Sequence, residues 1–186
     1  DKYCAYFSIV EIQNFLDDLQ PREEETFDFV QRMADVVYRT TDLYNGGTIY
    51  LTEGKFFLSW KLRHTNREAN FSSIARDSSE TASVIITTNL KILFGLAYKH
   101  KLHNLPFSEN GLARATIHCG LLYESIVGSP HHKIDIHYFG LDLNALHVFH
   151  DMANRYKTSM LLTEHVFAII PECMKVKCRK IDVIKF

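Results

Sequence analysis

The sequence has no excess of charge of either sign. Among its 186 residues, 21 Lys and Arg stand against 22 Asp and Glu, which gives a formal net charge of -1 at pH 7. Nucleic acids and acidic membrane surfaces are recruited by summed positive charge. We therefore expect no nucleic-acid partner and no membrane contact by this segment itself.

Cysteine is scarce, and its four positions show no CxxC spacing. Three of the four residues Cys4, Cys119, Cys173 and Cys178 lie among apolar residues, where cysteine behaves as a small hydrophobe. This pattern favours reduced thiols and a cytoplasmic location.

Leader and anchor signals are also missing from the sequence. The N-terminus lacks the charged-then-apolar layout of a signal peptide, and no run approaches the ~20 apolar residues that a membrane span needs. Both ends fall inside stretches that resemble strands, the last of which reaches Phe186. We therefore expect a domain excised from a longer chain, whose anchor or targeting signal would lie elsewhere.

Three common catalytic motifs are absent. GxxxxGK[ST], GxGxxG and the nucleophile elbow do not occur, so P-loop, dinucleotide-binding and serine-hydrolase functions have no motif support. The sequence also has no internal repeat and no low-complexity segment. Its length and 46% hydrophobic content are typical of one domain with a buried core, here residues 1–186.

Hydrophobic periodicity predicts alternating strands and helices. The predicted order is strand 3–15, helix 21–45, strands 48–52 and 55–60, a polar separator 63–79, helix 80–100, loop 101–112, strands 113–129 and 133–140, helix 141–157, strand 159–163, helix 164–170 and strand 178–186. Gly54 is expected to supply the positive φ of the first hairpin turn. The order predicts an α+β fold, a mostly antiparallel sheet covered by helices, with a ferredoxin-like βαββαβ kernel.

The predicted helix 141–157 carries both an apolar stripe and two histidines. Its inward face is expected to hold Leu141, Ala145, Val148, Phe149 and Met152. His147 and His150 lie three residues apart with Asp151 beside them, but a metal site needs several convergent ligands. Scattered structural histidines are therefore the favoured interpretation.

Two acidic residues are expected near each other on the sheet. Glu11 ends the first strand, and Glu53 lies at the tip of the adjacent hairpin. A carboxylate pair of this kind would suit a divalent cation. We keep this pair as a less favoured alternative.

Five local strings, in order along the chain, resemble segments of one enzyme family. They are EIQNF at 11–15, FVQRMADVVY at 29–38, NGGTIYLTEGKFFLSW at 45–60, ATIHCGLLYESIVGSPHHKIDIHYFGLDLN at 115–144 and CRKID at 178–182. Together they resemble the class III nucleotidyl cyclase homology domain, the catalytic domain of adenylyl and guanylyl cyclases, over nearly the whole chain. The Lys-Ile-Asp motif is most similar to those in cyclase domains of ciliates, apicomplexans and other protists.

The resemblance implies a partner and a chemistry. In that family two domains pair head to tail, and the active site forms at their interface. Two aspartates of one domain hold two metal ions that activate the ribose hydroxyl and clamp the triphosphate. The partner supplies two residues that read the base, plus an Asn and an Arg that stabilise the transition state.

The resemblance also implies that both metal positions are altered here. Glu11 aligns with the first metal aspartate and keeps a carboxylate, one methylene longer, which a hard cation would accept with altered geometry. Gly54 aligns with the second metal aspartate and supplies no ligand. Glu53 alternates to the other side of the strand and is a poor substitute.

The remaining aligned positions are mostly changed as well. Tyr50 stands at the base-reading Lys, and His137 at the second base-reading position. Asn144 matches the catalytic Asn, whereas Val148 stands at the position of the transition-state Arg. An apolar valine side chain makes no hydrogen bond to a phosphate.

Nucleotide binding without turnover stays open. The loop after the first strand, with Ile12, Gln13, Asn14 and Phe15, would offer backbone N–H groups to a phosphate near a helix start. ATP or GTP would then be the ligand, with Mg²⁺ or Mn²⁺ accompanying it. Otherwise no cofactor is expected.

The preserved framework and the altered site together predict a pseudoenzyme. We expect a catalytically degenerate cyclase-like domain that acts as a regulatory, dimerisation or scaffolding module in cyclic-nucleotide signalling, paired with a second cyclase-like domain as a homo- or heterodimer. The alternative is one half of a heterodimeric cyclase that makes cAMP or cGMP while its partner supplies the metal aspartates. Because the motifs are protist-like, two further locations stay open: the cytosolic face of a membrane protein, and a ciliary or cytoskeletal assembly.

Overall fold

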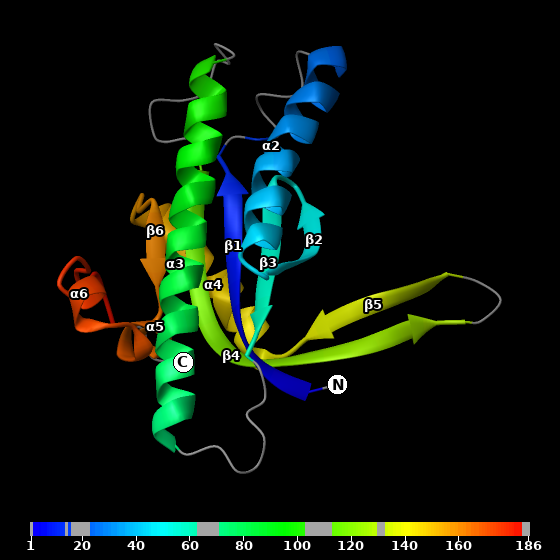
Figure 1. The fold of residues 1–186 in the computed structure, drawn as a ribbon. Helices are drawn as coiled ribbons and strands as arrows, with labels where there is room; N and C mark the ends of the chain where they lie inside the picture. Colours follow the sequence, from blue (N-terminus) through cyan, green and yellow to red (C-terminus); the bar gives the residue numbers. More distant parts are fainter. Residues whose placement is uncertain are drawn as a thin grey trace.

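The computed structural model of the chain describes residues 2–13, 15, 23–62, 71–102, 113–129 and 133–183. Strands and helices alternate along it (Figure 1). In chain order they are β1 Lys2–Ile12, α2 Glu23–Leu43, β2 Gly47–Thr52, β3 Lys55–Lys61, α3 Phe71–Leu102, β4 Ala113–Gly128, β5 Ile134–Phe139, α4 Leu141–Arg155, β6 Met160–Leu162, α5 Glu164–Ile169 and α6 Glu172–Lys175.

The described strands form one six-stranded sheet with β1 inside it. The strand order is β2-β3-β1-β4-β5. On the edge of β4 away from β1, residues 115–117 pair with β6 in parallel and residues 123–128 pair with β5 in antiparallel. The segment β1-α2-β2-β3-α3-β4, with antiparallel order β2-β3-β1-β4, is the ferredoxin-like kernel. The predicted α+β class and kernel are therefore confirmed.

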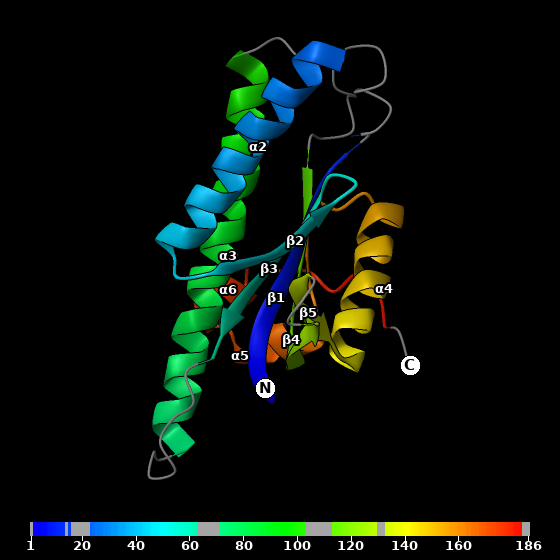
Figure 2. The same ribbon diagram turned by 90° about the vertical axis from the view of Figure 1, so that its right-hand side faces the viewer.

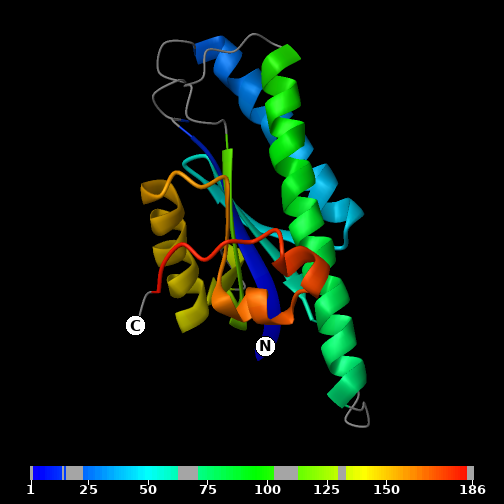
Figure 3. The ribbon, with the colours of Figure 1, turned by 90° about the vertical axis from the view of Figure 1, so that its left-hand side faces the viewer.

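Helices cover both faces of the sheet. Figure 2 shows α2 and α3 on one face and α4 on the other, and Figure 3 shows the same three layers from the opposite side. Successive residues of β1 alternate between these layers, because side chains of a strand point to opposite faces. Tyr6 and Val10 belong to the core under α2 and α3, whereas Phe7 and Ile9 belong to the core under α4. Glu11 follows the second set and so lies on the α4 side.

The first hairpin turns as the sequence predicts. Gly54 has φ +77° and Glu53 has φ +49°, the pair of positive values that suits a two-residue hairpin turn. The carbonyl oxygen of Gly54 accepts a hydrogen bond of 3.0 Å from the Ile12 backbone N–H. The hairpin tip is therefore fixed to the end of β1.

The ends of β4 and β5 form an arm that leaves the body of the molecule (Figure 1). β1 pairs with β4 only as far as Tyr123, and beyond this residue β4 pairs with β5 up to Gly128. Exposed apolar side chains on the arm are Ile126, Val127, Ile134, Ile136 and Phe139.

Two element predictions were wrong. Helix α3 begins at Phe71, inside the predicted polar separator, and runs on to Leu102. Once a helix has formed, each further residue adds one hydrogen bond for one residue fixed, so a helix extends readily through a polar stretch. Of the predicted strand 178–186, residues 178–183 are not a strand and 184–186 lie outside the described residues; the short helix α6 precedes them. This stretch crosses toward α4 (Figure 3), where the Tyr156 hydroxyl donates a hydrogen bond to Asp182.

The inward face of α4 differs from the predicted face. The buried residues are Leu143, Leu146, His150 and Ala153, whereas Leu141 is 87% exposed. The prediction followed the apolar side chains alone, and the true face carries a polar His. The helix is therefore rotated so that His150 meets the sheet together with three apolar side chains.

One segment contradicts the expectation that no apolar run is long enough to span a membrane. Within α3, Ser78–Lys99 is long and apolar enough to cross a membrane by length and composition alone. Its residues Ile85, Ile92 and Leu96 are fully buried in the core under α2 and α3. On the same segment, Phe94 and Tyr98 are 71% and 64% exposed.

Candidate functional site

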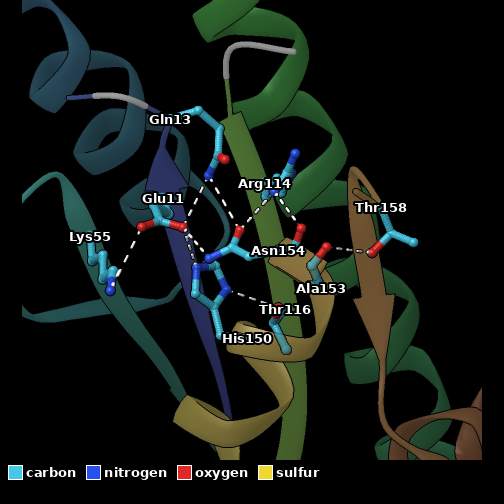
Figure 4. Close-up of polar contacts among 9 residues, drawn as sticks. All are labelled: Glu11, Gln13, Lys55, Arg114, Thr116, His150, Ala153, Asn154 and Thr158. Atoms are coloured by element: carbon cyan, nitrogen blue, oxygen red, sulfur yellow. Dashed lines mark hydrogen bonds and ion pairs between the residues drawn. The ribbon is translucent and has the colours of Figure 1, made fainter. Parts of the chain in front are cut away.

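The Glu11 carboxylate is the centre of a polar cluster between the sheet and α4 (Figure 4). Its Oε2 atom accepts hydrogen bonds from Asn154 Nδ2 at 2.8 Å and Gln13 Nε2 at 3.0 Å, and lies 2.9 Å from His150 Nε2. Its Oε1 atom lies 3.7 Å from Lys55 Nζ. Lys55 is directly opposite Glu11 in the β1–β3 register.

Two side chains of β4 extend the cluster. The Thr116 hydroxyl lies 2.9 Å from His150 Nδ1, so both ring nitrogens of this buried histidine have a partner. The Arg114 guanidinium, 6% exposed, donates to Asn154 Oδ1 at 3.0 Å and to the Asn154 carbonyl oxygen at 3.2 Å. The cluster therefore ties β1, β3 and β4 to α4.

The cluster holds Glu11 in its charged form. Burial alone would raise the pKa of this carboxyl, but hydrogen bonds from His150 and Asn154 and the nearby charge of Lys55 lower the pKa to about 2. The carboxylate is therefore ionised at neutral pH, and its neighbours are donors and a cation.

The hairpin tip beside this cluster has no room for a side chain. A Cβ atom built on Gly54 would lie 2.5 Å from Phe15 Cγ and 2.6 Å from Phe15 Cβ. Real Cβ atoms do not approach other atoms this closely. Glycine is thus required here both by φ and by the Phe15 ring.

Solved structures of nucleotidyl cyclases share this arrangement of strands and helices. A bacterial light-regulated adenylyl cyclase matches with a TM-score of 0.69 and 16% identity, over 91% of this chain and 45% of that chain. The adenylyl cyclase CyaB from P. aeruginosa matches with a TM-score of 0.61 and 11% identity, over 91% and 81% of the two chains. The chain has the fold of a class III nucleotidyl cyclase domain.

A third match is to a class III adenylyl cyclase-like ATP-binding protein from Pseudomonas aeruginosa. Its TM-score is 0.65 at 9% identity, over 94% of this chain and 36% of that chain. No protein-family profile and no curated protein matches the sequence. This cyclase-like domain spans less than half of the light-regulated enzyme, and identities this low establish the fold alone.

The residues of the cyclase-like domain do not fit the two metal ions of the family. Glu11 is surrounded by three hydrogen-bond partners and an ammonium group, and Gly54 has neither a ligand nor space for one. Glu53 is exposed on the turn. Across the described parts of the chain, no group of three or more His, Cys, Asp or Glu side chains could hold a metal ion.

The other predicted site residues are spread over the α4 side of the domain and the arm. Tyr50 is half-exposed and stacks on Phe57 with ring centroids 4.1 Å apart. Asn144 and Val148 are exposed on α4, and His137 is exposed on β5 of the arm. Their roles toward a base or a triphosphate stay predictions.

The loop predicted to bind phosphate is partly described. The Ile12 N–H is engaged by the Gly54 carbonyl oxygen, and the Ile12 side chain is buried in the core. Gln13 joins the Glu11 cluster, and Phe15 lies against Gly54. Asn14 lies outside the described residues, so the predicted phosphate contact of this loop stays a prediction.

Sequence reasoning missed most of the cluster around Glu11. His150 entered the prediction as a metal-ligand candidate, and Lys55, Arg114, Thr116 and Asn154 did not enter it. Two signals were present. Arg114, Thr116 and His118 alternate at the start of β4, and His150 and Asn154 are four apart on one face of a helix.

Proposed function

We propose that this protein is a catalytically degenerate nucleotidyl cyclase-like domain that acts as a regulatory, dimerisation or scaffolding module. The observation that carries the proposal is the state of the two metal positions. The Glu11 carboxylate is taken up by His150, Asn154 and Lys55, and the Phe15 ring covers Gly54. A cyclase needs carboxylate ligands that are free to hold two ions.

The magnitudes favour a loss of turnover. Removing one transition-state donor costs about 3 kcal/mol, a hundredfold or more in rate. Val148 stands where the resemblance places such a donor, and the loss of a metal ligand at Gly54 adds to the cost. Turnover of ATP or GTP would then fall below detection.

A turnover assay tests this proposal. The purified domain is incubated with ATP or GTP and with Mg²⁺ or Mn²⁺, and cyclic nucleotide is quantified. We expect no product above a sample without protein. Clear turnover that disappears in Glu11→Ala would contradict the proposal.

Pairing with a second cyclase-like domain is supported by the arm. Ile126 and Ile136 are opposite each other in the β4–β5 register, and they are 73% and 55% exposed. Apolar side chains gathered on a projecting hairpin mark an interaction surface. The proposed occupant is a cyclase-like domain, from a second copy or from another chain.

Sedimentation over a range of protein concentrations tests the pairing. We expect Ile126→Glu combined with Ile136→Glu to shift the protein toward monomer. Phe94→Glu on α3 is the control, because Phe94 is 71% exposed and lies on α3, in the helical layer on one face of the sheet and away from the arm. A monomer at every concentration would remove self-dimerisation from the proposal.

One comparison favours a second candidate function, nucleotide binding without turnover. A protein of the same fold is described as an adenylyl cyclase-like ATP-binding protein. For the present chain, thermal unfolding with and without millimolar ATP or GTP is the test. A midpoint that stays unchanged would count against binding.

The heterodimeric cyclase is less well supported. In such a pair this chain would supply the base-reading Lys and the transition-state Arg, and Tyr50 and Val148 stand at those positions. Mixing the domain with a cyclase domain that keeps both metal aspartates distinguishes the two cases. Stimulated turnover would favour the heterodimer.

A further inference from the structure

We infer that Lys55 is a built-in cation at the first metal position of the cyclase fold, so that Glu11 anchors β1 to α4 in place of binding a divalent cation. The inference rests on the proposed function in one respect, the assignment of Glu11 to that metal position. It goes further, because it states what the altered residues do now.

The sheet register brings the two charges together. Glu11 and Lys55 are directly opposite partners on β1 and β3. Both side chains point to the α4 side, because they follow the alternation that puts Phe57 and Ile9 there. The Lys55 ammonium lies 3.7 Å from Glu11 Oε1, and the two side chains are 28% and 16% exposed. Both side chains of the pair are thus largely shielded from water.

The second carboxylate oxygen is also engaged. Glu11 Oε2 is within 3.0 Å of nitrogen atoms of Gln13, His150 and Asn154. A carboxylate offers about four lone-pair sites over its two oxygens. The three nitrogen neighbours therefore take up Oε2, and the Lys55 ammonium faces Oε1 as an ion pair 3.7 Å away (Figure 4).

The local charge further disfavours a divalent cation. Lys55 balances Glu11, and the Arg114 guanidinium is held by Asn154 with only a small fraction of its surface exposed. The charges of Lys55 and Arg114 together exceed the single negative charge of Glu11. An added ion of charge +2 beside Glu11 would repel Lys55 across a few ångströms of partly buried space.

The anchoring role follows from where the donors originate. His150 and Asn154 lie one turn apart on α4, and the strand residues Glu11, Arg114 and Thr116 meet them from two neighbouring strands. The Glu11 charge thus holds the helix against the sheet at the same place where the family resemblance puts a metal ion.

The test measures Mn²⁺ binding and stability on the full domain. Mn²⁺ alone is the probe, followed by the water-proton relaxation that protein-bound Mn²⁺ enhances. We expect the relaxation enhancement to be the same for the unchanged protein and for Glu11→Gln. We also expect the urea midpoint to be the same in Mn²⁺ as in EDTA. Saturable Mn²⁺ binding that Glu11→Gln abolishes would overturn the inference.

Lys55→Met tests the internal cation. We expect it to lower the folding equilibrium constant about tenfold, since it leaves a half-buried carboxylate without its counter-charge. Lys133→Met is the matched control, an exposed lysine that pairs with Asp135 on the arm, and its effect should stay below about threefold. Equal effects of the two substitutions would refute the role given to Lys55.

The outcomes separate this inference from the proposed function. Cyclic nucleotide formed without Mn²⁺ binding at Glu11 would overturn the proposed function alone. Mn²⁺ held by Glu11 without turnover would overturn the internal cation alone.

Discussion

Replacing Gly54 by Ala is the substitution that the structure resists most clearly. The residue has φ +77°, a conformation that costs an L-residue about 1–2 kcal/mol. Its new Cβ would lie 2.5 Å from Phe15 Cγ, and overpacking of this kind typically costs about 1–3 kcal/mol. We therefore expect Gly54→Ala to lower the free energy of unfolding by about 2–5 kcal/mol, a large share of the stability of a typical domain.

Gly47 provides the control for this substitution. It lies at the start of β2 in the same hairpin, and a Cβ atom added to it would have Ser59 Oγ as its nearest neighbour, 3.8 Å away. Gly47→Ala should change the free energy of unfolding by no more than about 0.5 kcal/mol. Both values come from urea denaturation followed by circular dichroism.

A double-mutant cycle separates the two costs at Gly54. Combining Gly54→Ala with Phe15→Gly removes both the Phe15 Cβ and the ring that the new Cβ would meet, and leaves the strained backbone. The double variant should therefore be more stable than the sum of the single effects by about 1–3 kcal/mol. Additive effects, or a Gly54→Ala variant as stable as Gly47→Ala, would refute the closed hairpin tip.

Three further predictions concern the α4 side of the sheet. The pKa of Glu11 is lowered to about 2, so its charged form contributes about 1–2 kcal/mol to the free energy of unfolding after a discount for solvent screening. This contribution is present above pH 4.5 and is lost as the pH falls toward 2. Glu11→Gln should flatten this part of the acid-unfolding curve. Burial lowers the pKa of His118, and nearby His165 lowers it further, although Asp142 acts in the opposite direction. The urea concentration at the unfolding midpoint should therefore decrease as the pH drops below about 6.5, and it should decrease less steeply in His118→Gln. Gly120→Ala would press a Cβ against the Asp142 carboxylate that accepts the Leu121 N–H, and should cost about 1–3 kcal/mol in urea unfolding.

Local patterns were enough to predict the kernel of the fold. The apolar strand β1, the amphipathic helix α2 and the turn at Gly54 all follow from short-range periodicity and turn chemistry. The start of α3 and the irregular stretch 178–183 were not predictable in this way. A helix extends through polar residues once it has formed. Residues 178–183 run toward α4 (Figure 3), and a strand-like pattern cannot show that the chain leaves the sheet.

The candidate site was predictable only in part. The resemblance singled out Glu11 and Gly54, since both lie in short strings that can be aligned. The contact between Glu11 and Lys55 depends on the register of β1 against β3, which residues far apart in sequence determine. His150 was visible in the sequence, but its direction depends on the rotation of α4.

A crystal structure of the domain, grown or soaked with Mn²⁺ and a non-hydrolysable ATP or GTP analogue, would decide whether Glu11 still binds a metal ion. Anomalous scattering at the manganese edge locates the ions without bias from the nearby side chains. We predict no manganese peak at Glu11, with the Lys55 ammonium beside its carboxylate. Two manganese peaks about 4 Å apart, bridged by the triphosphate and bound by Glu11, would contradict both the lost metal site and the internal cation.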